Sequence, residues 1–465
     1  MTNLQEFDVC VIGAGPGGYV SAIRLAQLGK KVAIVEAESL GGICLNWGCI
    51  PTKSLLRSAE VLHLVQNHKH FGISAEKISA NLKEMVARSR NVANQLSNGV
   101  SGLLKKNKIT IIKGFASFVN SEIIAVEGEV KTEVKAKKFI VATGARAKVL
   151  KGFEPDGQNI LTYKEAMLQE KIPETLLIVG SGAIGIEFAS FYNSIGSKVC
   201  VIEAQDRILP QEDKEISEFA KKSFTKQGIQ IKTSVKLISM KTLQKNVEIE
   251  YEHEGKNFTS KFDKVIMAVG ITPNTDKLNL KVTKVQLDNR GFIIAKDDLS
   301  TDDPSIYAIG DVVEGPWLAH KASHEGIIAA EAISGLKTKS IKKLRIPGCT
   351  YSMPQIASVG LTEEKAKDMG YKLKIGRFPF IGNGKAIALG EPEGLVKIIF
   401  NEKTGEILGC HMIGSEVTEL INSMTLAIGL EATEEDIFHT IFPHPTLSEM
   451  IHESALNAFG RSIHI

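Results

Sequence analysis

The sequence predicts an α/β protein built from two similar βαβ units, followed by a separate C-terminal domain. An apolar strand, the glycine pattern GxGxxG, a helix, a second apolar strand and an acid occur in this order twice. The acid lies 23 residues beyond the first glycine in both copies, from Gly13 to Glu36 and from Gly180 to Glu203. From Pro347 onward the pattern changes to strands, helices and a proline-interrupted tail. A chain of 465 residues is long enough for about three domains.

Each repeat has the residues that a dinucleotide-binding turn requires. Glycines permit a tight turn and let backbone N–H groups approach a pyrophosphate at the helix N-terminus. The terminal carboxylate accepts hydrogen bonds from a ribose diol and repels a 2′-phosphate, which favours FAD and NAD over NADP, although Arg207 near the second acid weakens this preference slightly. Ordinary βαβ turns are the alternative, but two copies with equal spacing make a chance match improbable. The Rossmann-like sets are Gly13, Gly15, Gly18 and Glu36, and Gly180, Gly182, Gly185 and Glu203.

Two cysteines, Cys44 and Cys49, lie just downstream of the first glycine pattern and indicate a dithiol that serves a cofactor. Zinc sites need further ligand pairs, and structural disulfides belong to small secreted domains. Two buried, unreactive thiols are the alternative. Lys53 lies one helical turn after Cys49, where a cation favours a thiolate, although an ordinary solvated lysine would look the same.

The segments between and after the repeats carry weaker signals. Residues 52 to about 106 have helical spacing, and 109–141 alternate in the manner of β-hairpins. The first unit closes on 141–145 and the second on 267–270. The strand 306–311 ends in glycine and an acid, suited to placing a carboxylate against a polyol chain. Three histidines in the segment from 52 to about 106 are interpreted as part of a solvated helix face, because no nearby cysteine or carboxylate completes a metal site. They are His63, His68 and His70.

Composition narrows the class of protein further. The net charge is +3 with no long run of one sign, which argues against a nucleic-acid partner. Six cysteines are too few for a disulfide framework in a chain of this length, so a reducing compartment is expected. No window of 18 apolar residues predicts a membrane span, and the N-terminus lacks the features of an export signal. We therefore expect a cytoplasmic location.

The tail contains a histidine between two prolines. The His444 imidazole titrates near neutral pH and can act as a base, although turn geometry alone could explain the residue. Residues 446–449, Thr-Leu-Ser-Glu, match a helix capping box, which is one interpretation of Glu449.

Taken together, these motifs resemble the flavin-dependent pyridine nucleotide-disulfide oxidoreductases over essentially the whole chain. The resemblance rests on the double glycine pattern, 42–53, 142–144, 310–311 and 444–449. Residues 318–322, followed by Glu325 and Gly326, resemble the lipoamide branch more than glutathione or mercuric reductases. The tail also lacks the cysteine pair expected of a mercuric reductase.

The resemblance implies four segments: an FAD-binding domain at 1–145, an NAD-binding domain at 146–270, a central segment at 271–344 that completes the FAD-binding unit, and an α+β dimerisation domain at 345–465. It implies a homodimer whose active site is composite, with His444 and Glu449 reaching the disulfide of the other subunit. It further implies oxidation of dihydrolipoamide carried in trans by lipoyl domains of 2-oxo acid dehydrogenase complexes and the glycine cleavage system, with NAD⁺ as acceptor. A related reductase with another substrate and a redox-idle structural flavoprotein are the alternatives.

Residue roles carry over from the family position by position. A substrate thiolate would attack Cys44, Cys49 would face the flavin, and Glu449 would orient His444. Trp47 departs from the smaller residues usual inside the redox motif. The implied catalytic set is Cys44, Cys49, Lys53, Glu187, His444 and Glu449, with Lys53 paired to Glu187. The implied FAD contacts are Gly13, Gly15, Gly18, Glu36, Lys53, Gly114, Thr143, Gly144, Asp311 and Ala319, and the implied NAD contacts are Gly180, Gly182, Gly185, Glu203, Val235 and Gly270.

Overall fold

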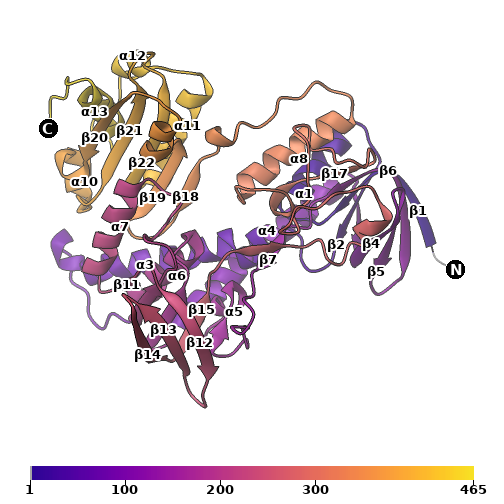
Figure 1. The fold of residues 1–465 in the computed structure, drawn as a ribbon, viewed down its shortest axis with the longest axis horizontal. Helices are drawn as coiled ribbons and strands as arrows, with labels where there is room; N and C mark the ends of the chain where they lie inside the picture. The colour runs from indigo at the N-terminus through magenta and orange to yellow at the C-terminus, as the bar shows by residue number, and fades with distance from the viewer. Residues whose placement is uncertain (1–2) are drawn as a thin grey trace. The chain divides into compact units, whose positions relative to one another are not determined.

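The computed structural model describes residues 3–465, which are drawn in Figure 1. These residues form two compact units. The first unit combines residues up to 54 with 84–148 and 270–341. The second combines 55–83, 149–269 and 342–465. Each unit therefore gathers segments that lie far apart in the sequence.

The first unit is built on one sheet with the strand order β3-β2-β1-β6-β5-β4, and β17 also pairs with β6. Strands β3, β2, β1, β6 and β17 run parallel, so their carboxyl ends meet at one edge. The strands are β1 (Asn3–Ile12), β2 (Val32–Glu36), β3 (Thr110–Lys113), β4 (Phe115–Asn120), β5 (Ile123–Glu127), β6 (Thr132–Val141) and β17 (Ile306–Ala308).

The prediction of β-hairpins over 109–141 was correct only in part. Strands β4, β5 and β6 form an antiparallel meander, as hairpins do. Strand β3 instead joins the edge of the main sheet in parallel with β2, with Ala33 opposite Thr110. A short alternating segment has the same pattern in both arrangements, so the sequence alone did not separate them.

Helices α1 (Pro16–Gln27), α4 (Leu82–Lys106) and α8 (Ala319–Ile333) supply apolar side chains to one face of this sheet. Helices α1 and α8 pack closely, because Gly17 and Gly326 leave no side chain between their backbones. A Cβ on Gly326 would lie 2.6 Å from the Gly17 carbonyl oxygen. The smaller elements are α2 (Gly42–Trp47), β7 (Ala145–Ala147), β16 (Ile271–Pro273), η2 (Leu280–Val282) and η3 (Gly310–Val312). Helix α3 (Cys49–Gln66) starts in the first unit, and η1 (His68–Phe71) follows it.

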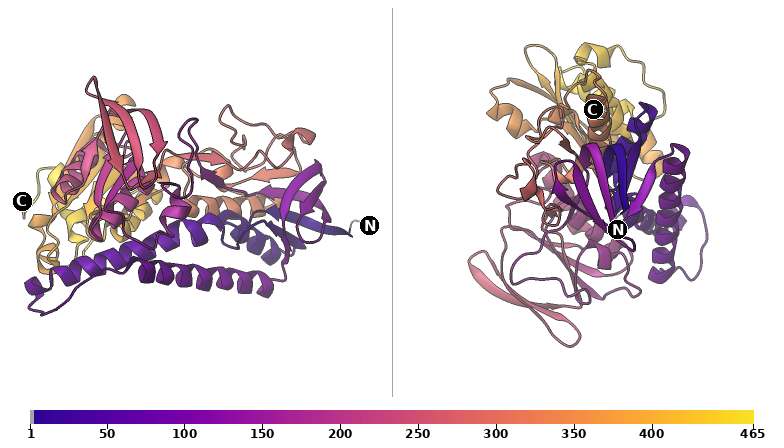
Figure 2. Two further views of the ribbon diagram at one scale, coloured as in Figure 1. Left: turned by 90° about the horizontal axis from the view of Figure 1, so that it is seen from below. Right: turned by 90° about the vertical axis from the view of Figure 1, so that its right-hand side faces the viewer.

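The second unit begins with a parallel sheet of the order β11-β10-β9-β15-β8, the same winding as in the first unit. A three-stranded antiparallel ribbon, β12-β13-β14, extends beside it (Figure 2). The strands are β8 (Ile160–Leu161), β9 (Thr175–Val179), β10 (Lys198–Ile202), β11 (Gln230–Lys232), β12 (Lys236–Thr242), β13 (Val247–His253), β14 (Lys256–Phe262) and β15 (Lys264–Met267). The helices are α5 (Tyr163–Ala166), α6 (Ala183–Ser194) and α7 (Lys214–Lys226).

The C-terminal part of this unit is an antiparallel sheet of the order β18-β19-β22-β21-β20, with α11 and α13 packed against it. Two parallel βαβ sheets and an α+β C-terminal part confirm the predicted fold class. The strands are β18 (Gly348–Thr350), β19 (Gln355–Gly360), β20 (Leu373–Pro379), β21 (Leu395–Asn401) and β22 (Ile407–Gly414). The helices are η4 (Lys343–Arg345), α9 (Glu363–Asp368), η5 (Phe380–Gly382), α10 (Gly384–Leu389), α11 (Val417–Gly429), α12 (Glu434–Phe438) and α13 (Glu449–Ala458).

A row of polar residues crosses this C-terminal sheet. Arg377, Lys397, His411 and Ser358 lie directly opposite one another on neighbouring strands, so their side chains share one face. The Lys397 ammonium is 1% exposed and lies 2.7 Å from a carboxylate oxygen of Asp213, the residue that caps α7. The row therefore ties the C-terminal sheet to the parallel sheet within the same unit.

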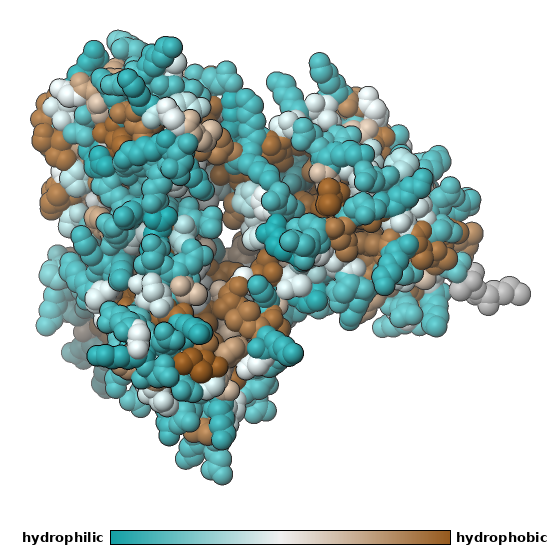
Figure 3. All heavy atoms as spheres, in the orientation of Figure 1, coloured by the Kyte–Doolittle hydropathy of each residue, from teal (hydrophilic) through white to brown (hydrophobic). Residues whose placement is uncertain are grey.

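The C-terminal part also has exposed large apolar residues. Leu426, Leu430 and Ile441 are 64%, 73% and 95% exposed in the single chain. Figure 3 shows apolar atoms, in brown, on the C-terminal part of the face in view. Across residues 3–465, no helix combines the length and the hydropathy that a membrane span requires.

Candidate active site

Cys44 and Cys49 flank the break between α2 and α3. The chain reverses at Gly48, where a Cβ would lie only 3.1 Å from the Ile43 carbonyl oxygen. The Thr52 hydroxyl donates to the Gly48 carbonyl at 2.7 Å and holds the first turn of α3 against this break. The structure describes both cysteines as free thiols.

The two thiols affect each other's ionisation. A side-chain hydrogen bond with Cys49 and desolvation raise the pKa of the Cys44 thiol, and the nearby negative charges of Cys49 and Asp311 act in the same direction. The Lys53 ammonium acts in the opposite direction. The pair therefore holds a proton between its sulfur atoms, and Lys53 is the charge that favours a thiolate.

Trp47, which departs from the usual residues of the redox motif, stacks with a cation that was not predicted from the sequence. The Arg90 guanidinium lies 4.6 Å from the centre of the Trp47 ring. Desolvation lowers the pKa of Arg90, and its Nε and Nη2 atoms have no hydrogen-bond partner among the described residues. No motif surrounds Arg90 in α4, so no local pattern could have found it.

The first cradle is the glycine turn that carries Gly13, Gly15 and Gly18. Its glycines have two different roles. A Cβ on Gly13 would overlap the Ala142 carbonyl oxygen, and a Cβ on Gly18 would overlap the Gly13 carbonyl oxygen. Gly13 also has a φ of +101°, which disfavours any other residue. By contrast, a Cβ on Gly15 would meet nothing within 4 Å. The first and third glycines are required by the fold, whereas the second borders open space where a pyrophosphate fits.

The second cradle repeats this arrangement. Gly180 has a φ of +100°, and its Cβ would overlap the Ala268 carbonyl oxygen. A Cβ on Gly185 would overlap the Gly180 carbonyl oxygen, and one on Gly182 would meet nothing within 4 Å. Both cradles therefore fit a dinucleotide phosphate group.

The two strand-end acids are held by the backbone of the turns that they follow. Glu36 accepts the Ala14 N–H at 2.7 Å and the Glu38 N–H at 2.8 Å. Glu203 accepts the Ser181 N–H at 2.8 Å and the Ser181 hydroxyl at 2.6 Å, and its other oxygen accepts the Gln205 N–H at 2.9 Å. Both carboxylates lie at the ends of their strands beside the glycine turns, as a ribose-binding acid must.

Gly114 and Val235 occupy equivalent places in the two units. The Gly114 N–H donates to the Glu36 carbonyl at 3.0 Å, and the Val235 N–H donates to the Glu203 carbonyl at 2.9 Å. Gly114 has a φ of +147°, and a Cβ there would lie 2.6 Å from the Glu127 carbonyl oxygen. Gly114 therefore lies beside Glu36, and Val235 lies beside Glu203.

Three further predicted contacts lie where strands β6 and β15 end. The Thr143 hydroxyl donates to the Asn274 carbonyl at 2.9 Å, and the Asn274 N–H donates to the Gly144 carbonyl at 2.9 Å. Gly270, predicted to contact NAD, has a φ of +107° and accepts the Lys148 N–H at 3.0 Å. The Asn274 side-chain amide also donates to the Thr143 carbonyl at 2.9 Å, so Asn274 holds the end of β6 from both its backbone and its side chain.

Asp311 and Ala319 lie in the first unit, near the edge where β17 ends. Desolvation raises the pKa of the Asp311 carboxyl to about 6, and the Lys321 ammonium acts in the opposite direction. Lys321 and Glu325 form a buried ion pair of 2.7 Å, and Glu325 also accepts the Gly310 N–H at 2.7 Å. This ion pair was not predicted from the sequence, although its spacing of four residues on a helix is a recognisable signal. Ala319 is the first residue of α8.

His444 and Glu449 form the histidine–carboxylate pair that the tail motif predicts. The Nδ1 atom of His444 lies 2.9 Å from one oxygen of Glu449, and the other oxygen accepts the Thr446 N–H at 2.8 Å. Burial alone would raise the pKa of Glu449, but the Thr446 N–H and the His444 imidazole lower it overall. Glu449 is therefore a carboxylate that orients the imidazole.

The capping-box interpretation was correct only in part. Glu449 accepts the Thr446 N–H, as the box requires, but helix α13 starts at Glu449 with Ser448 as its N-cap. The Thr446 hydroxyl donates instead to the Pro443 carbonyl at 2.7 Å. One oxygen of Glu449 accepts from the backbone and the other lies beside His444, so the two contacts do not exclude each other.

Glu187 is buried on α6 in the second unit, where it accepts the Tyr351 N–H at 3.0 Å. Lys53 belongs to the first unit, so the predicted pairing of Lys53 with Glu187 stays a prediction. Arg207 lies after Glu203 as expected, but its guanidinium forms an ion pair with Glu364 at 2.8 Å.

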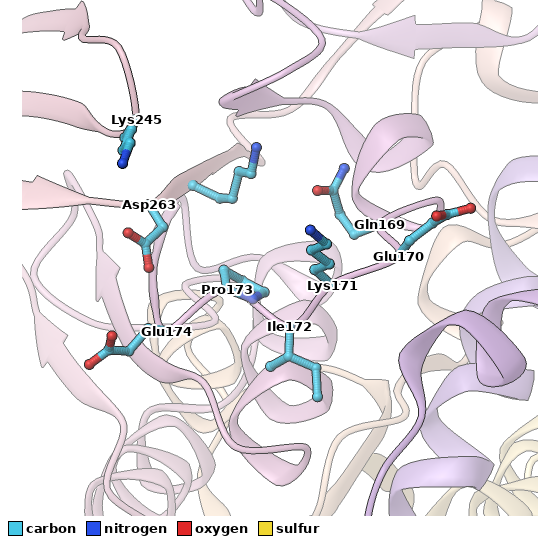
Figure 4. Close-up of a pocket in the computed structure, with 9 residues that line it drawn as sticks. Gln169, Glu170, Lys171, Ile172, Pro173, Glu174, Lys245 and Asp263 are labelled. Atoms are coloured by element: carbon cyan, nitrogen blue, oxygen red, sulfur yellow. The ribbon is translucent and has the colours of Figure 1, made fainter.

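A hollow of about 510 Å³ in the second unit contains none of the predicted site residues. Figure 4 shows that its walls carry charges of both signs, including Glu170, Lys171, Lys245 and Asp263. It is a shallow surface feature beside the loop 169–174, and the site residues lie elsewhere.

Residues 7–326 match the family described as pyridine nucleotide-disulphide oxidoreductase, and 346–455 match the dimerisation domain of that family. A protein of Zymomonas mobilis named dihydrolipoyl dehydrogenase is 50% identical, with 99% of each chain covered. Proteins of the same name from Rhizobium etli and Bacillus subtilis are 49% and 44% identical and cover 98% and 99% of this chain and 99% of their own.

Solved structures share the fold over nearly the whole chain. LpdA from Mycobacterium tuberculosis superimposes with a TM-score of 0.90 at 25% identity, covering 98% of this chain and 99% of that one. The Cu(II) complex of the HOCl-induced flavoprotein disulfide reductase RclA from Escherichia coli gives a TM-score of 0.88 at 26% identity, with 97% and 99% covered.

Proposed function

The chain belongs to the pyridine nucleotide-disulphide oxidoreductase family, and from this membership we propose that it oxidises dihydrolipoamide to lipoamide. It is an FAD-dependent, NAD-linked oxidoreductase whose full-length relatives are named dihydrolipoyl dehydrogenase. The observation that carries the proposal is the pair of interacting thiols, Cys44 and Cys49. The Lys53 ammonium lies one helical turn after Cys49. A disulfide formed there is the electron acceptor that a dithiol substrate needs.

The reaction begins with removal of a proton from one thiol of the substrate. Because His444 Nδ1 is bonded to Glu449, its Nε2 is the atom that accepts this proton. The Glu449 carboxylate then stabilises the imidazolium, which agrees with its lowered pKa. His444 is the base of the proposed reaction, and Glu449 sets its orientation and tautomer.

Thiol–disulfide exchange follows. The substrate thiolate attacks Cys44 Sγ, which forms a mixed disulfide, breaks the Cys44–Cys49 bond and releases Cys49 as a thiolate. The second substrate thiol attacks the mixed disulfide, closes the lipoamide ring and leaves its proton on Cys44. Lys53 stabilises the thiolate form of the enzyme dithiol. Bound FAD supplies a two-electron relay from this dithiol to NAD⁺, so that the disulfide is restored.

The two cradles supply the proposed cofactor sites. FAD would be held by Gly13, Gly15, Gly18 and Glu36, together with Lys53, Gly114, Thr143, Gly144, Asp311 and Ala319. NAD would be held by Gly180, Gly182, Gly185 and Glu203, together with Val235 and Gly270. The open space beside Gly15 and Gly182 supports this assignment. The proposed domain limits remain 1–145, 146–270, 271–344 and 345–465.

The match to a dimerisation domain supports a homodimer, and the exposed apolar residues of the C-terminal part agree with it. We place the His444–Glu449 pair of each subunit against the disulfide of the other, because the His444 side chain is 79% exposed in the single chain. Lipoyl domains of 2-oxo acid dehydrogenase complexes and the glycine cleavage system would deliver the substrate arm in trans, in the cytoplasm.

The proposed activity is tested by NADH formation from dihydrolipoamide and NAD⁺. We expect turnover by the purified protein and its loss in Cys44→Ser. Absence of NADH formation, with NAD(P)H-dependent reduction of another disulfide instead, would sink the substrate assignment.

The composite site is tested by mixing two inactive variants, His444→Gln and Cys44→Ser, with different affinity tags. A purified heterodimer has one intact site, in which His444 of the second variant faces Cys44 of the first. We expect about half the activity of the unmodified dimer. An inactive heterodimer would contradict a shared site.

A further inference from the structure

We propose that Glu364 strengthens the preference for NAD over NADP by holding Arg207 in an ion pair, away from the place of a 2′-phosphate. The inference rests on the proposed NAD site at Glu203. It assigns a specificity role to a residue that lies outside both cradles and far from Glu203 in the sequence.

The ion pair is two-pronged. Arg207 Nη2 lies 2.8 Å from Glu364 Oε2, and Arg207 Nη1 donates to Glu364 Oε1 at 3.1 Å. The hydrogen bond with Glu364 raises the pKa of Arg207. The planar guanidinium is therefore matched to the planar carboxylate, the geometry in which an arginine binds an oxyanion most strongly.

Arg207 lies in the loop that borders the proposed ribose site. This loop runs from Glu203, at the end of β10, to Asp213 at the start of α7. Within it, the Leu209 N–H donates to the Ser181 carbonyl at 3.1 Å, which returns the loop to the glycine turn. An arginine near a strand-end acid is the group that accommodates a 2′-phosphate in NADP-binding sites of this fold. Arg207 thus has the right chemistry and place for NADP, but its guanidinium is already occupied.

A second cation near Glu203, Lys232, is occupied as well. Lys232 ends β11, and its carbonyl accepts the Glu203 N–H at 2.9 Å. Its ammonium donates to the Tyr251 hydroxyl at 2.9 Å and lies 5.2 Å from the centre of the Phe258 ring. With both cations bound to protein groups, Glu203 and Asp206 leave an acidic field where a 2′-phosphate would have to bind.

An isolated ion pair between partly exposed side chains contributes little, and Arg207 and Glu364 are 26% and 47% exposed. Glu364, however, follows a residue that is firmly held. The Glu363 N–H donates to Asp213 at 3.0 Å, and the Glu363 carboxylate lies 2.7 Å from Lys397. Because α9 is fixed by these buried contacts, Glu364 is presented to Arg207 with little freedom left to lose.

The test compares Glu364→Gln with a matched control, Glu174→Gln. The control removes the same charge from a pair of 3.1 Å with Lys198, at the opposite end of β10. We would titrate the FAD-loaded protein with adenosine 2′,5′-bisphosphate and with 5′-AMP by calorimetry, and measure kcat/KM for NADP⁺ and NAD⁺.

We expect Glu364→Gln to bind the bisphosphate roughly two- to fivefold more tightly, the scale of one partly exposed charge contact. Binding of 5′-AMP should be unchanged, and the NADP⁺ to NAD⁺ ratio of kcat/KM should rise by a similar factor. The double variant Glu364→Gln/Arg207→Met should lose this gain, because the released guanidinium is its source.

No gain in Glu364→Gln, an equal gain in Glu174→Gln, or a gain that survives in the double variant would each overturn the inference while NAD-linked turnover stands. If the unmodified protein binds neither nucleotide, the proposed NAD site fails and the inference fails with it. The calorimetric result is independent of dithiol chemistry, so a wrong substrate assignment would leave it intact.

Discussion

The two nucleotide cradles have nearly the same backbone but hold their acids differently. In the first, half-buried Glu36 is held by backbone N–H groups alone. In the second, Glu203 is buried and also accepts the Ser181 hydroxyl at 2.6 Å, where the first cradle has Ala14. The second acid is therefore more fixed by the protein before any ligand binds.

The helices that follow the glycine turns also differ in their packing. Gly17 lets α1 approach α8 in the first unit, whereas the corresponding position in α6 is Ile184, which is 45% exposed. This difference shows that glycines in and near the shared pattern have separate structural roles. Forming the turn and leaving room for a ligand are common to both copies, and helix packing belongs to the first alone.

The largest effect should come from the third glycines. In Gly18→Ala and Gly185→Ala the new methyl group overlaps a backbone carbonyl oxygen, so each variant should lose about 3 kcal/mol of unfolding free energy. Gly18→Ala should be purified without FAD, whereas Gly185→Ala should keep FAD and lose NAD⁺ reduction. Flavin absorbance and urea unfolding measure both. Equal loss of FAD in the two variants would contradict separate cradles.

A smaller effect should come from Asp311, an acid of the first unit. In the folded apoprotein this carboxyl keeps its proton up to about pH 6, whereas an ordinary aspartate loses it near 3.8. Folding therefore favours the protonated form, and stability falls as the pH rises from about 4 to above 6.

Asp311→Asn should remove this loss and stabilise the apoprotein at neutral pH by on the order of 2 kcal/mol. Its affinity for FAD should fall, because the proposed contact of Asp311 with the ribityl chain would be weakened. Thermal unfolding of the apoprotein at pH 4.5 and 7.5 measures the effect. Unchanged pH dependence in the variant would show that Asp311 is not the titrating group.

Removing the extra hydroxyl from the second cradle should cost about 1.5 kcal/mol, the lower end for a hydrogen bond to a charged group. Ser181→Ala deletes a hydrogen bond to the Glu203 carboxylate. Ser197→Ala is the matched control, because its hydroxyl donates to the neutral Pro173 carbonyl at 2.7 Å in the same unit. Urea unfolding at neutral pH should show the larger loss in Ser181→Ala, since hydrogen bonds to charged groups are stronger. An equal or smaller loss would remove the distinction between the two acids.

The smallest effect on stability should come from the middle glycines. A Cβ on Gly15 or Gly182 meets nothing within 4 Å, so Gly15→Ala and Gly182→Ala should change the unfolding free energy by less than about 0.5 kcal/mol. Cofactor affinity should nevertheless fall, for FAD in the first variant and for NAD⁺ in the second. Calorimetry on each variant checks this, and unaltered affinities would mean that the open space is not the phosphate site.

Local patterns predicted the parts of the site that neighbours in the sequence build. The glycine turns and their acids depend on spacing within about 25 residues, and the pairing of His444 with Glu449 lies within one short motif. The family resemblance is confirmed, as are the fold class and the use of FAD and NAD.

Contacts between distant segments were not predictable in the same way. Arg207 and Glu364 are separated by 157 positions, and Trp47 meets Arg90 across two helices. Neither pair has a periodic or spacing signal, because each depends on how the elements pack. The sequence also did not distinguish the parallel strand β3 from a hairpin strand, since alternation is common to both.

The polar row on the C-terminal sheet has a consequence for how the second unit opens. Removing Lys397 would leave the fully buried Asp213 carboxylate without its cation, at a cost of about 3 to 5 kcal/mol. Partial opening that separated α7 from β21 would carry the same cost. The amide hydrogens of these two elements should therefore exchange together with solvent deuterium, so that the parallel sheet and the antiparallel sheet behave as one cooperative block.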